Sequence, residues 1–341
     1  MNTVDAAAGL SGQVIVDLTK KHTLFEWSAQ GAVDPIPVAG AKGCWFWTPE
    51  GKRFLDFNSQ LMCVNIGHGH ERVVRAIQRQ VETLAYANPF MATEPRARLG
   101  QKLAEITPGD IDTFFFTNGV LVPPDGYLQG VREFCTKHGI LMIADEVMSG
   151  FGRTGEWFAV DNWRVVPDLL TMAKGLTSAY VPLGAVGMRH AIAEHFRDKV
   201  FFGGLTYNSH PLACATALAT LQVYEEDGLI QNARRMGGIM KGLMDGLASR
   251  HAIVGATRAI GLFGIVELVK NRSSMEPLAP FNGTSEPMKR LGKFFREEGL
   301  YTFVRWNTFF TNPPLSISEE ELRHGFGIIE RGLSMLKNAE C

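Results

Sequence analysis

The sequence predicts an α/β fold, with a mainly parallel sheet in a large domain and a smaller α+β domain. Short apolar runs alternate with segments of helical periodicity through the middle of the chain, a pattern typical of a sheet with crossover helices. One of these runs, 140–144, is continuously apolar, as expected of a strand buried on both faces. The length of 341 residues suits about two domains of roughly 150 residues each.

The elements follow from periodicity and turn residues. An amphipathic stretch at 14–27 comes first, and then a hairpin at 44–57, because Pro49 and Gly51 suit the turn between its halves. The helix expected at 127–138 would end before Gly139, because glycine readily adopts the left-handed conformation that closes a helix. The other expected helices are 71–81, 95–107, 211–224, 288–298 and one that starts at the capping box Ser318–Glu321. The expected strands are 113–116, 140–144, 169–173, 184–188, 261–269 and 301–305.

The domain boundary is expected near Gly228, after the Ala-rich helix. The large domain would then comprise 58–227. The small domain would combine 1–57 with 228–341, because the N-terminal segment is expected to pack back onto the C-terminal part.

Composition excludes several classes of protein. Lys plus Arg (34) and Asp plus Glu (35) leave a net charge of −1, so no global field favours nucleic acid. No 18 consecutive apolar residues occur, and residues 1–12 lack Lys and Arg, which is atypical of a secretory signal. The five cysteines are scattered and never form a C-x-x-C pair, which indicates reduced thiols in a cytoplasmic protein.

Asp145 and Lys174 are the most informative pair. Each follows an apolar run, and their separation suits one crossover between parallel strands, so both are expected at the carboxyl edge of the sheet, where ligands bind. A lysine there can form a Schiff base, and an acid can keep a pyridinium nitrogen protonated. The spacing alone also allows Asp145 to be a helix cap and Lys174 a solvated loop residue.

Four segments in order resemble motifs of class III aminotransferases, and the resemblance runs from about residue 25 to the C-terminus. They are 143–155 around Asp145, 167–176 around Lys174, 205–211, and 312–315. The nearest branch is the one that acts on ω-amino acids, taurine and amines. The resemblance implies the aspartate-aminotransferase-like fold (fold type I) and pyridoxal 5′-phosphate as cofactor.

The resemblance gives roles to residues around the cofactor. Lys174 would bind it covalently and carry a proton, Asp145 would pair with the pyridine nitrogen, and Val147 would pack on a ring face. Asn118 and Gly119, at the end of a strand, would also contact the cofactor. Val147 could equally be an ordinary core residue.

Thr206 would bind the phosphate of the neighbouring subunit's cofactor, which implies a homodimer with shared active sites, or a tetramer built from such dimers. The alternative for Thr206 is a side chain that bonds nearby backbone groups. Arg305 matches a movable arginine that binds substrate carboxylates, and its alternative is a solvated charge at a strand end. Met62 and Trp27 would line the substrate pocket. Met62 replaces a tryptophan of many amine transaminases, which argues against bulky aryl-amine substrates, and Trp27 could instead be core.

Two motifs are weaker. The segment 150–155 fits G-x-G-x-x-G, but 145–149 separate it from the preceding strand and no good helix follows, so nicotinamide binding is not expected. His68 and His70 have no partner motif at zinc spacing, so no metal is expected.

The function predicted is a pyridoxal-phosphate-dependent aminotransferase. It would move an amino group from an ω-amino acid, a taurine-like sulfonate or an amine to a 2-oxo acid such as pyruvate or 2-oxoglutarate. Two alternatives stay open: an aminomutase or lyase on the same fold, and a cofactor-free scaffold or binding protein.

A family segment of roughly a hundred residues, about three βα units, is absent near 119–121. In the family it carries the phosphate cradle and the aromatic that stacks on the ring. A sheet without these strands would leave apolar faces and edges open. We therefore expect that residues are missing between Gly119 and Val120, which would then not be bonded to each other, and that the structure shows no pyridoxal phosphate on Lys174.

Overall fold

The computed structural model describes residues 10–22, 33–84, 92–115, 126–199 and 210–337. The middle of the chain forms a four-stranded sheet in the order β4 (Ile111–Phe115), β7 (Ala185–Arg189), β6 (Leu169–Met172), β5 (Ile143–Asp145). β5 and β6 pair in parallel, whereas β7 is antiparallel to both of its neighbours. β4, β5 and β6 therefore share one direction, which confirms the α/β prediction with β7 as the reversed strand.

The expectation that 140–144 is buried on both faces is wrong. The strand begins only at Ile143, and Leu141 and Ile143 are 58% and 62% exposed. Met142 and Ala144, which alternate with them, are buried. The reason is that β5 is the last strand of the described sheet, and one of its two faces has no cover among the described residues.

Helices flank this sheet. α3 and α4 both pack against α7, a long helix that starts with a proline and buries a series of alanines. α5 begins and ends where the sequence predicts. The bounds are α3 (Glu71–Thr83), α4 (Glu94–Ile106), α5 (Tyr127–His138), α6 (His190–Glu194) and α7 (Pro211–Glu226), with 3₁₀ turns η2 (Ala159–Trp163) and η3 (Lys174–Leu176).

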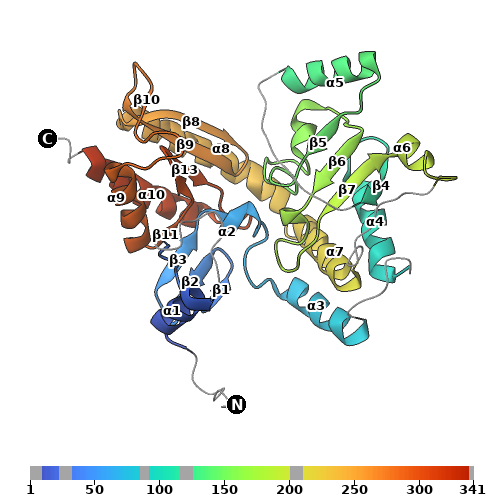
Figure 1. The fold of residues 1–341 in the computed structure, drawn as a ribbon, viewed down its shortest axis with the longest axis horizontal. Helices are drawn as coiled ribbons and strands as arrows, with labels where there is room; N and C mark the ends of the chain where they lie inside the picture. Colours follow the sequence, from blue (N-terminus) through green and yellow to red (C-terminus); the bar gives the residue numbers. More distant parts are fainter. Residues whose placement is uncertain (1–9, 23–32, 85–91, 116–125, 200–209, 338–341) are drawn as a thin grey trace.

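The N-terminal strands join the C-terminal part of the chain. The predicted hairpin is present as β2 (Trp45–Trp47) and β3 (Arg53–Asp56), and β3 pairs in parallel with β11 (Leu300–Tyr301). Also here are α1 (Gly12–His22), β1 (Gly40–Lys42), α2 (Ser59–Met62), α9 (Glu286–Glu297) and α10 (Glu319–Lys337). Figure 1 shows these elements in one lobe and the β4–β7 sheet in the other. The domain boundaries 58–227 and 1–57 with 228–341 stay a prediction.

A second sheet completes the C-terminal lobe, and part of it was not predicted. β9 (Phe263–Asn271) pairs with β8 (Val254–Ile260), β13 (Thr308–Thr311) and β10 (Glu276–Pro277), and β13 also pairs with β12 (Val304–Arg305). α8 (Leu229–Arg250) packs against β8. Its four glycines weaken the helical signal, but one of them, Gly237, lies so close to Gly261 that a Cβ would meet backbone atoms at 2.6 Å.

Candidate active site

The ends of β5 and β6 bring the predicted pair to one edge. Asp145 is the last residue of β5 and lies in register with Thr171 of β6, and Lys174 follows β6 after Ala173. Because the strands are parallel, both side chains start from the same carboxyl edge of the sheet. The alternative in which Asp145 caps a helix does not hold in the described chain, because turns follow it.

Lys174 is held in a conformation that an ordinary loop lysine rarely adopts. Its φ is 45°, in the left-handed region, and its side chain is half-buried. Burial lowers the pKa of Lys174, while the nearby Cys63 and Asp145 act in the opposite direction. The amine therefore loses its proton more readily than a solvated lysine, as a nucleophilic or proton-carrying lysine requires.

Asp145 and its surroundings suit a ligand nitrogen. Its Oδ1 accepts a hydrogen bond from the backbone N–H of Val147 at 3.2 Å, and Val147 is buried. The buried Thr171 hydroxyl, in register with Asp145, has no hydrogen-bond partner in the described chain. A buried polar atom without a partner beside a carboxylate indicates a place for a polar ligand.

The turn η3, which begins at Lys174, is held by residues that the sequence analysis did not single out. A Cβ on Gly175 would meet Asn65 Nδ2 at 2.6 Å and Phe151 Cβ at 2.8 Å, and the Tyr224 hydroxyl donates to the Gly175 carbonyl at 2.9 Å. Gly175 follows Lys174 directly, so these contacts position the lysine. The signal available in the sequence was the glycine itself, which permits close approach of the backbone.

Arg153, in the segment 150–155, connects three parts of the chain. Its fully buried guanidinium donates to the Leu262 and Pro313 carbonyls, at 3.0 and 2.6 Å. It also donates to Ser59 Oγ at 3.1 Å and Asn65 Oδ1 at 2.5 Å. Burial lowers the pKa of Arg153 to about 10. The segment 150–155 thus forms turns whose Arg153 holds other parts of the chain together. This structural role agrees with the sequence argument against a dinucleotide loop.

Met62 lies at the end of a strained turn beside the lysine. Ser59, Gln60 and Met62 all have positive φ, and the buried Asp56 holds the turn by accepting a bond from the Gln60 N–H at 2.9 Å. Met62 is buried, and the adjacent Cys63 interacts electrostatically with Lys174. The structure thus places this turn near the amine.

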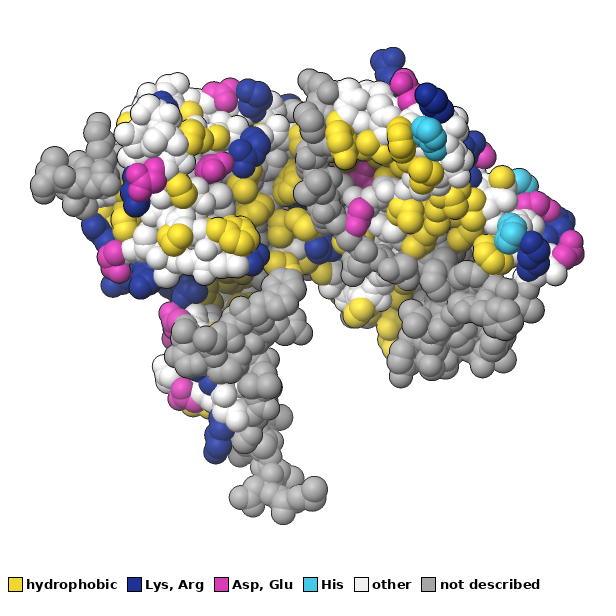
Figure 2. All heavy atoms as spheres, turned by 45° about the horizontal axis from the view of Figure 1, so that its top comes forward, with side chains coloured by type: hydrophobic (Ala, Val, Ile, Leu, Met, Phe, Trp, Pro, Cys, Tyr) yellow, Lys and Arg dark blue, Asp and Glu magenta, His cyan; other side chains and the backbone are white. Residues whose placement is uncertain are grey.

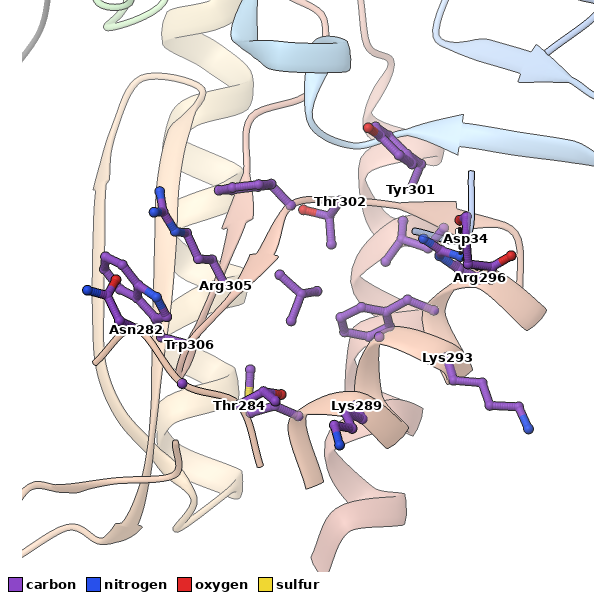
Figure 3. A pocket seen from close by; sticks show the side chains of 17 residues that line it. Asp34, Asn282, Thr284, Lys289, Lys293, Arg296, Tyr301, Thr302, Arg305 and Trp306 are labelled. Atoms are coloured by element: carbon purple, nitrogen blue, oxygen red, sulfur yellow. Dashed lines mark hydrogen bonds and ion pairs between the residues drawn. The ribbon is translucent and has the colours of Figure 1, made fainter. Parts of the chain in front are cut away.

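Arg305 lies elsewhere in the described chain. It belongs to β12, and its guanidinium carbon is 4.3 Å from the ring centroid of Trp306. Both line a cavity of about 860 Å³ between α9 and β11–β12, shown in Figure 3. Neither Lys174 nor Asp145 is among its described lining residues, so the structure does not bring Arg305 to the pair.

The remaining predicted positions cannot be placed. Trp27, Asn118, Gly119 and Thr206 lie outside the described residues, as does the junction between Gly119 and Val120. The expectation that residues are missing between Gly119 and Val120 is wrong, because the full sequence of 341 residues runs directly from Gly119 to Val120.

The two histidines of the weaker motif have acidic partners. His68 Nε2 lies 2.9 Å from Asp56 Oδ2, and His70 Nε2 lies 3.0 Å from Asp227 Oδ2. Within the described ranges no three His, Cys, Asp or Glu residues are grouped so as to hold a metal, and no helix there is long and apolar enough to cross a membrane.

Comparison with known proteins decides the family. The model of the family described as aminotransferase class-III matches residues 28–120 and 117–333. The chain belongs to the class III aminotransferases. Members of this family use pyridoxal 5′-phosphate, which agrees with a lysine and an acid at neighbouring strand ends.

Relatives and solved structures agree with this assignment. The omega-aminotransferase of Caulobacter vibrioides is 29% identical, with 89% of this chain and 94% of the relative covered. The taurine–pyruvate aminotransferase of Rhodobacter capsulatus is 36% identical, with 66% and 46% covered. The structure of a taurine:2-oxoglutarate aminotransferase from Bifidobacterium kashiwanohense, in complex with PLP and glutamate, has a TM-score of 0.93 at 29% identity and covers 98% and 100% of the two chains.

The family segment expected to be absent is indeed missing. The Caulobacter alignment spans 423 positions, yet 89% of 341 residues is only about 303, so about 120 positions have no counterpart here. The family model likewise matches in two pieces that meet at 117–120. We call this missing stretch the interval.

Proposed function

We propose that this chain is an aminotransferase that takes an amino group from an ω-amino acid, a taurine-like sulfonate or an amine and passes it to a 2-oxo acid. The observation that carries the proposal is the Lys174–Asp145 pair at the ends of neighbouring parallel strands. Names of relatives support the substrate class: they include an omega-aminotransferase, a putrescine–pyruvate and several taurine–pyruvate aminotransferases.

The residues present fit the ring end of pyridoxal phosphate. A partly buried lysine with a lowered pKa faces the same edge as a carboxylate, and the unpartnered Thr171 hydroxyl lies beside that carboxylate. Lys174 would hold the aldehyde carbon, Asp145 the pyridine nitrogen, and Val147 a ring face. Thr206, with Asn118 and Gly119, would hold the phosphate, together with the interval that this chain lacks.

The chemistry divides between cofactor and protein. Bound here, pyridoxal phosphate supplies an electron sink for the bonds at the amino-bearing carbon. The Asp145 carboxylate would hold a proton on the ring nitrogen, because an anion stabilises that cation. Lys174 Nζ would hold the cofactor and would also serve as the acid and base for the proton of the amino-bearing carbon. Met62 and Trp27 would line the donor pocket, and Arg305 would bind a donor carboxylate, although in the described chain it lines a separate cavity.

The assembly that we propose is a cytoplasmic homodimer with shared active sites. The argument is the role of Thr206, which would reach the cofactor of the neighbouring subunit. Analytical ultracentrifugation measures this state directly.

A spectroscopic titration tests the function. Pyridoxal phosphate added to the purified chain should give a visible band of the lysine adduct, which bleaches when an accepted donor is added. Borohydride should then fix the cofactor mass on the peptide that contains Lys174, and Lys174→Ala should show neither the band nor the mass. A donor panel of taurine, β-alanine, 4-aminobutyrate and simple amines, each with pyruvate and with 2-oxoglutarate, identifies the substrates.

Other outcomes of this titration separate the alternatives. A band that persists with every donor and acceptor, together with isomerised or eliminated product, would mean a mutase or lyase. No band at saturating cofactor, both with this chain alone and with the interval inserted after Gly119, would contradict the proposal and favour a scaffold.

A further inference from the structure

The segment that runs from α5 into β5 carries an unusual concentration of exposed apolar side chains. Within the 17 residues of 127–143, five large hydrophobic side chains are between 48% and 62% exposed: Tyr127, Phe134, Ile140, Leu141 and Ile143. Figure 2 shows hydrophobic side chains gathered on the lobe to which β5 and α5 belong. Single exposed hydrophobic side chains are ordinary, but five of them within 17 residues, three of which (Ile140, Leu141 and Ile143) lead into β5, favour an interaction surface.

The backbone of β5 is open on the same side. The Met142 carbonyl accepts from the Leu169 N–H at 3.1 Å, and the Glu146 N–H donates to the Thr171 carbonyl at 2.9 Å, so these residues face β6. In a parallel ladder alternate residues face opposite neighbours, so the backbone groups of Ile143 and Asp145 point to the other edge. No described strand pairs there.

We propose that this surface, the free edge of β5 with the apolar side chains of 127–143, binds a polypeptide equivalent to the interval. The inference does not depend on the aminotransferase activity. It names the occupant from three observations: the position of the gap, its length, and the geometry of the uncovered strand.

The position and length of the gap favour this occupant. The family model divides at 117–120, directly after β4 and just before α5 and β5, which are the elements left uncovered. About 120 missing positions correspond to about three βα units at 30 or more residues each. That is enough chain to add a strand beside β5 and to lay a helix over Leu141 and Ile143.

The face of β5 adds a further reason. Ile143 and Asp145 alternate with the buried Ala144 along β5, so the exposed Ile143 shares its face of the strand with the candidate catalytic acid. A second copy of this chain could pair with the edge, but it would lack the same interval and would leave the same face without its cover. We therefore assign the surface to the interval and treat self-association as an outcome of the test.

Co-expression tests the proposal. The full chain is produced together with a tagged polypeptide that corresponds to the interval of the Caulobacter vibrioides relative, without added cofactor. Capture on the tag should retain the chain in a 1:1 complex, and hydrogen exchange should show new protection of the amides of Ile143 and Asp145.

Variants make the test specific. Ile143→Pro removes the N–H that faces the free edge without removing a bond to β6, and should reduce capture by at least about tenfold. Val81→Thr is the matched control, because Val81 is 50% exposed on α3 and should leave capture unchanged. Ile143→Thr, which keeps the N–H but loses apolar area, should have an intermediate effect.

Three results would overturn the proposal. One is failure to capture the chain while the amides of β5 stay unprotected. Another is capture that Ile143→Pro and Val81→Thr affect equally, and the third is a concentration-dependent dimer of the chain alone that Ile143→Pro abolishes. None of these readouts involves pyridoxal phosphate, so a failed cofactor titration and a failed complementation are distinguishable.

Discussion

At the scale of single residues, buried polar groups determine where this protein is sensitive to substitution and pH. Glu146 follows the candidate acid Asp145 but points into the core, where Ser149 Oγ donates to it at 2.5 Å and the Val160 N–H at 2.8 Å. Burial raises the pKa of Glu146 to about 7, although these hydrogen bonds oppose the shift. Neighbouring carboxylates in one sequence motif thus serve different purposes because one is buried.

Glu146 should make stability depend on pH. Its pKa is about 7 in the folded chain against 4.5 as the reference, so between these values the folded state keeps a proton that the unfolded state releases. Stability present below pH 4.5 is therefore lost as the pH rises through 7, by at most about 3 kcal/mol. Urea unfolding at pH 5 and pH 8 measures this loss, and Glu146→Gln should remove most of it. Glu71→Gln, at a side chain that is 74% exposed, should change nothing; an equal pH slope in both variants would refute the assignment.

Replacement of the buried Arg153 should strongly lower the free energy of unfolding. Arg153→Met would leave the Leu262 and Pro313 carbonyls and Asn65 Oδ1 without their donor inside the core. We expect a loss of about 3–5 kcal/mol in the free energy of unfolding, measured with urea. Arg234→Met, which breaks a surface pair with Glu156, should cost less than about 1 kcal/mol. A small loss at Arg153 would mean that water replaces its bonds.

At the scale of elements, helix ends follow the local rules that the sequence displays. The capping box of α10 is present, since the Glu321 N–H donates to Ser318 Oγ at 3.2 Å and the Ser318 N–H to Glu321 Oε2 at 3.0 Å. α5 ends at Gly139 with φ of 64°, and the Ile140 N–H donates to the Cys135 carbonyl at 2.9 Å. Such ends depend on neighbours within six residues, which is why sequence alone located them.

Two alanine substitutions in α5 should have opposite effects. Gly139→Ala places a side chain in the left-handed region and should destabilise the chain by about 1 kcal/mol, although no atom lies within 4 Å of the new Cβ. Gly130→Ala, inside the same helix and also with open space, should stabilise it by about 0.5–1 kcal/mol. Thermal unfolding of both variants checks the pair. Effects of the same sign would show that α5 contributes little to the measured transition.

At the scale of the whole molecule, the missing interval is the dominant feature. It explains why the sheet of the described residues ends at β5 and why apolar side chains of 127–143 face solvent. A chain with this surface should bind hydrophobic dyes in its native state, which is not typical of a well-covered globular protein.

Insertion of the interval into the chain should cover the exposed apolar side chains of 127–143. With the Caulobacter vibrioides interval placed between Gly119 and Val120, dye fluorescence should fall severalfold and the urea m-value should rise, because more surface is buried on folding. An insert of Gly and Ser of equal length is the control and should change neither quantity. If both inserts behave alike, the exposed face is a stable property of this chain and not an unfilled place in its fold.

The sequence by itself determined the family, the order of α and β elements, several helix ends and the pairing of Asp145 with Lys174 on one sheet edge. These depend on local propensity, on hydrophobic period, and on the rule that parallel strands end on the same side. Only the tertiary structure decided that β5 is an edge strand with one open face, that α8 is a helix despite its glycines, that Arg153 bridges three segments and that Arg305 lies in a separate cavity. The reason is physical: burial, a close backbone approach such as that of Gly237 to Gly261, and the pKa of Glu146 depend on atoms distant in sequence, and no local pattern records which of those atoms are present.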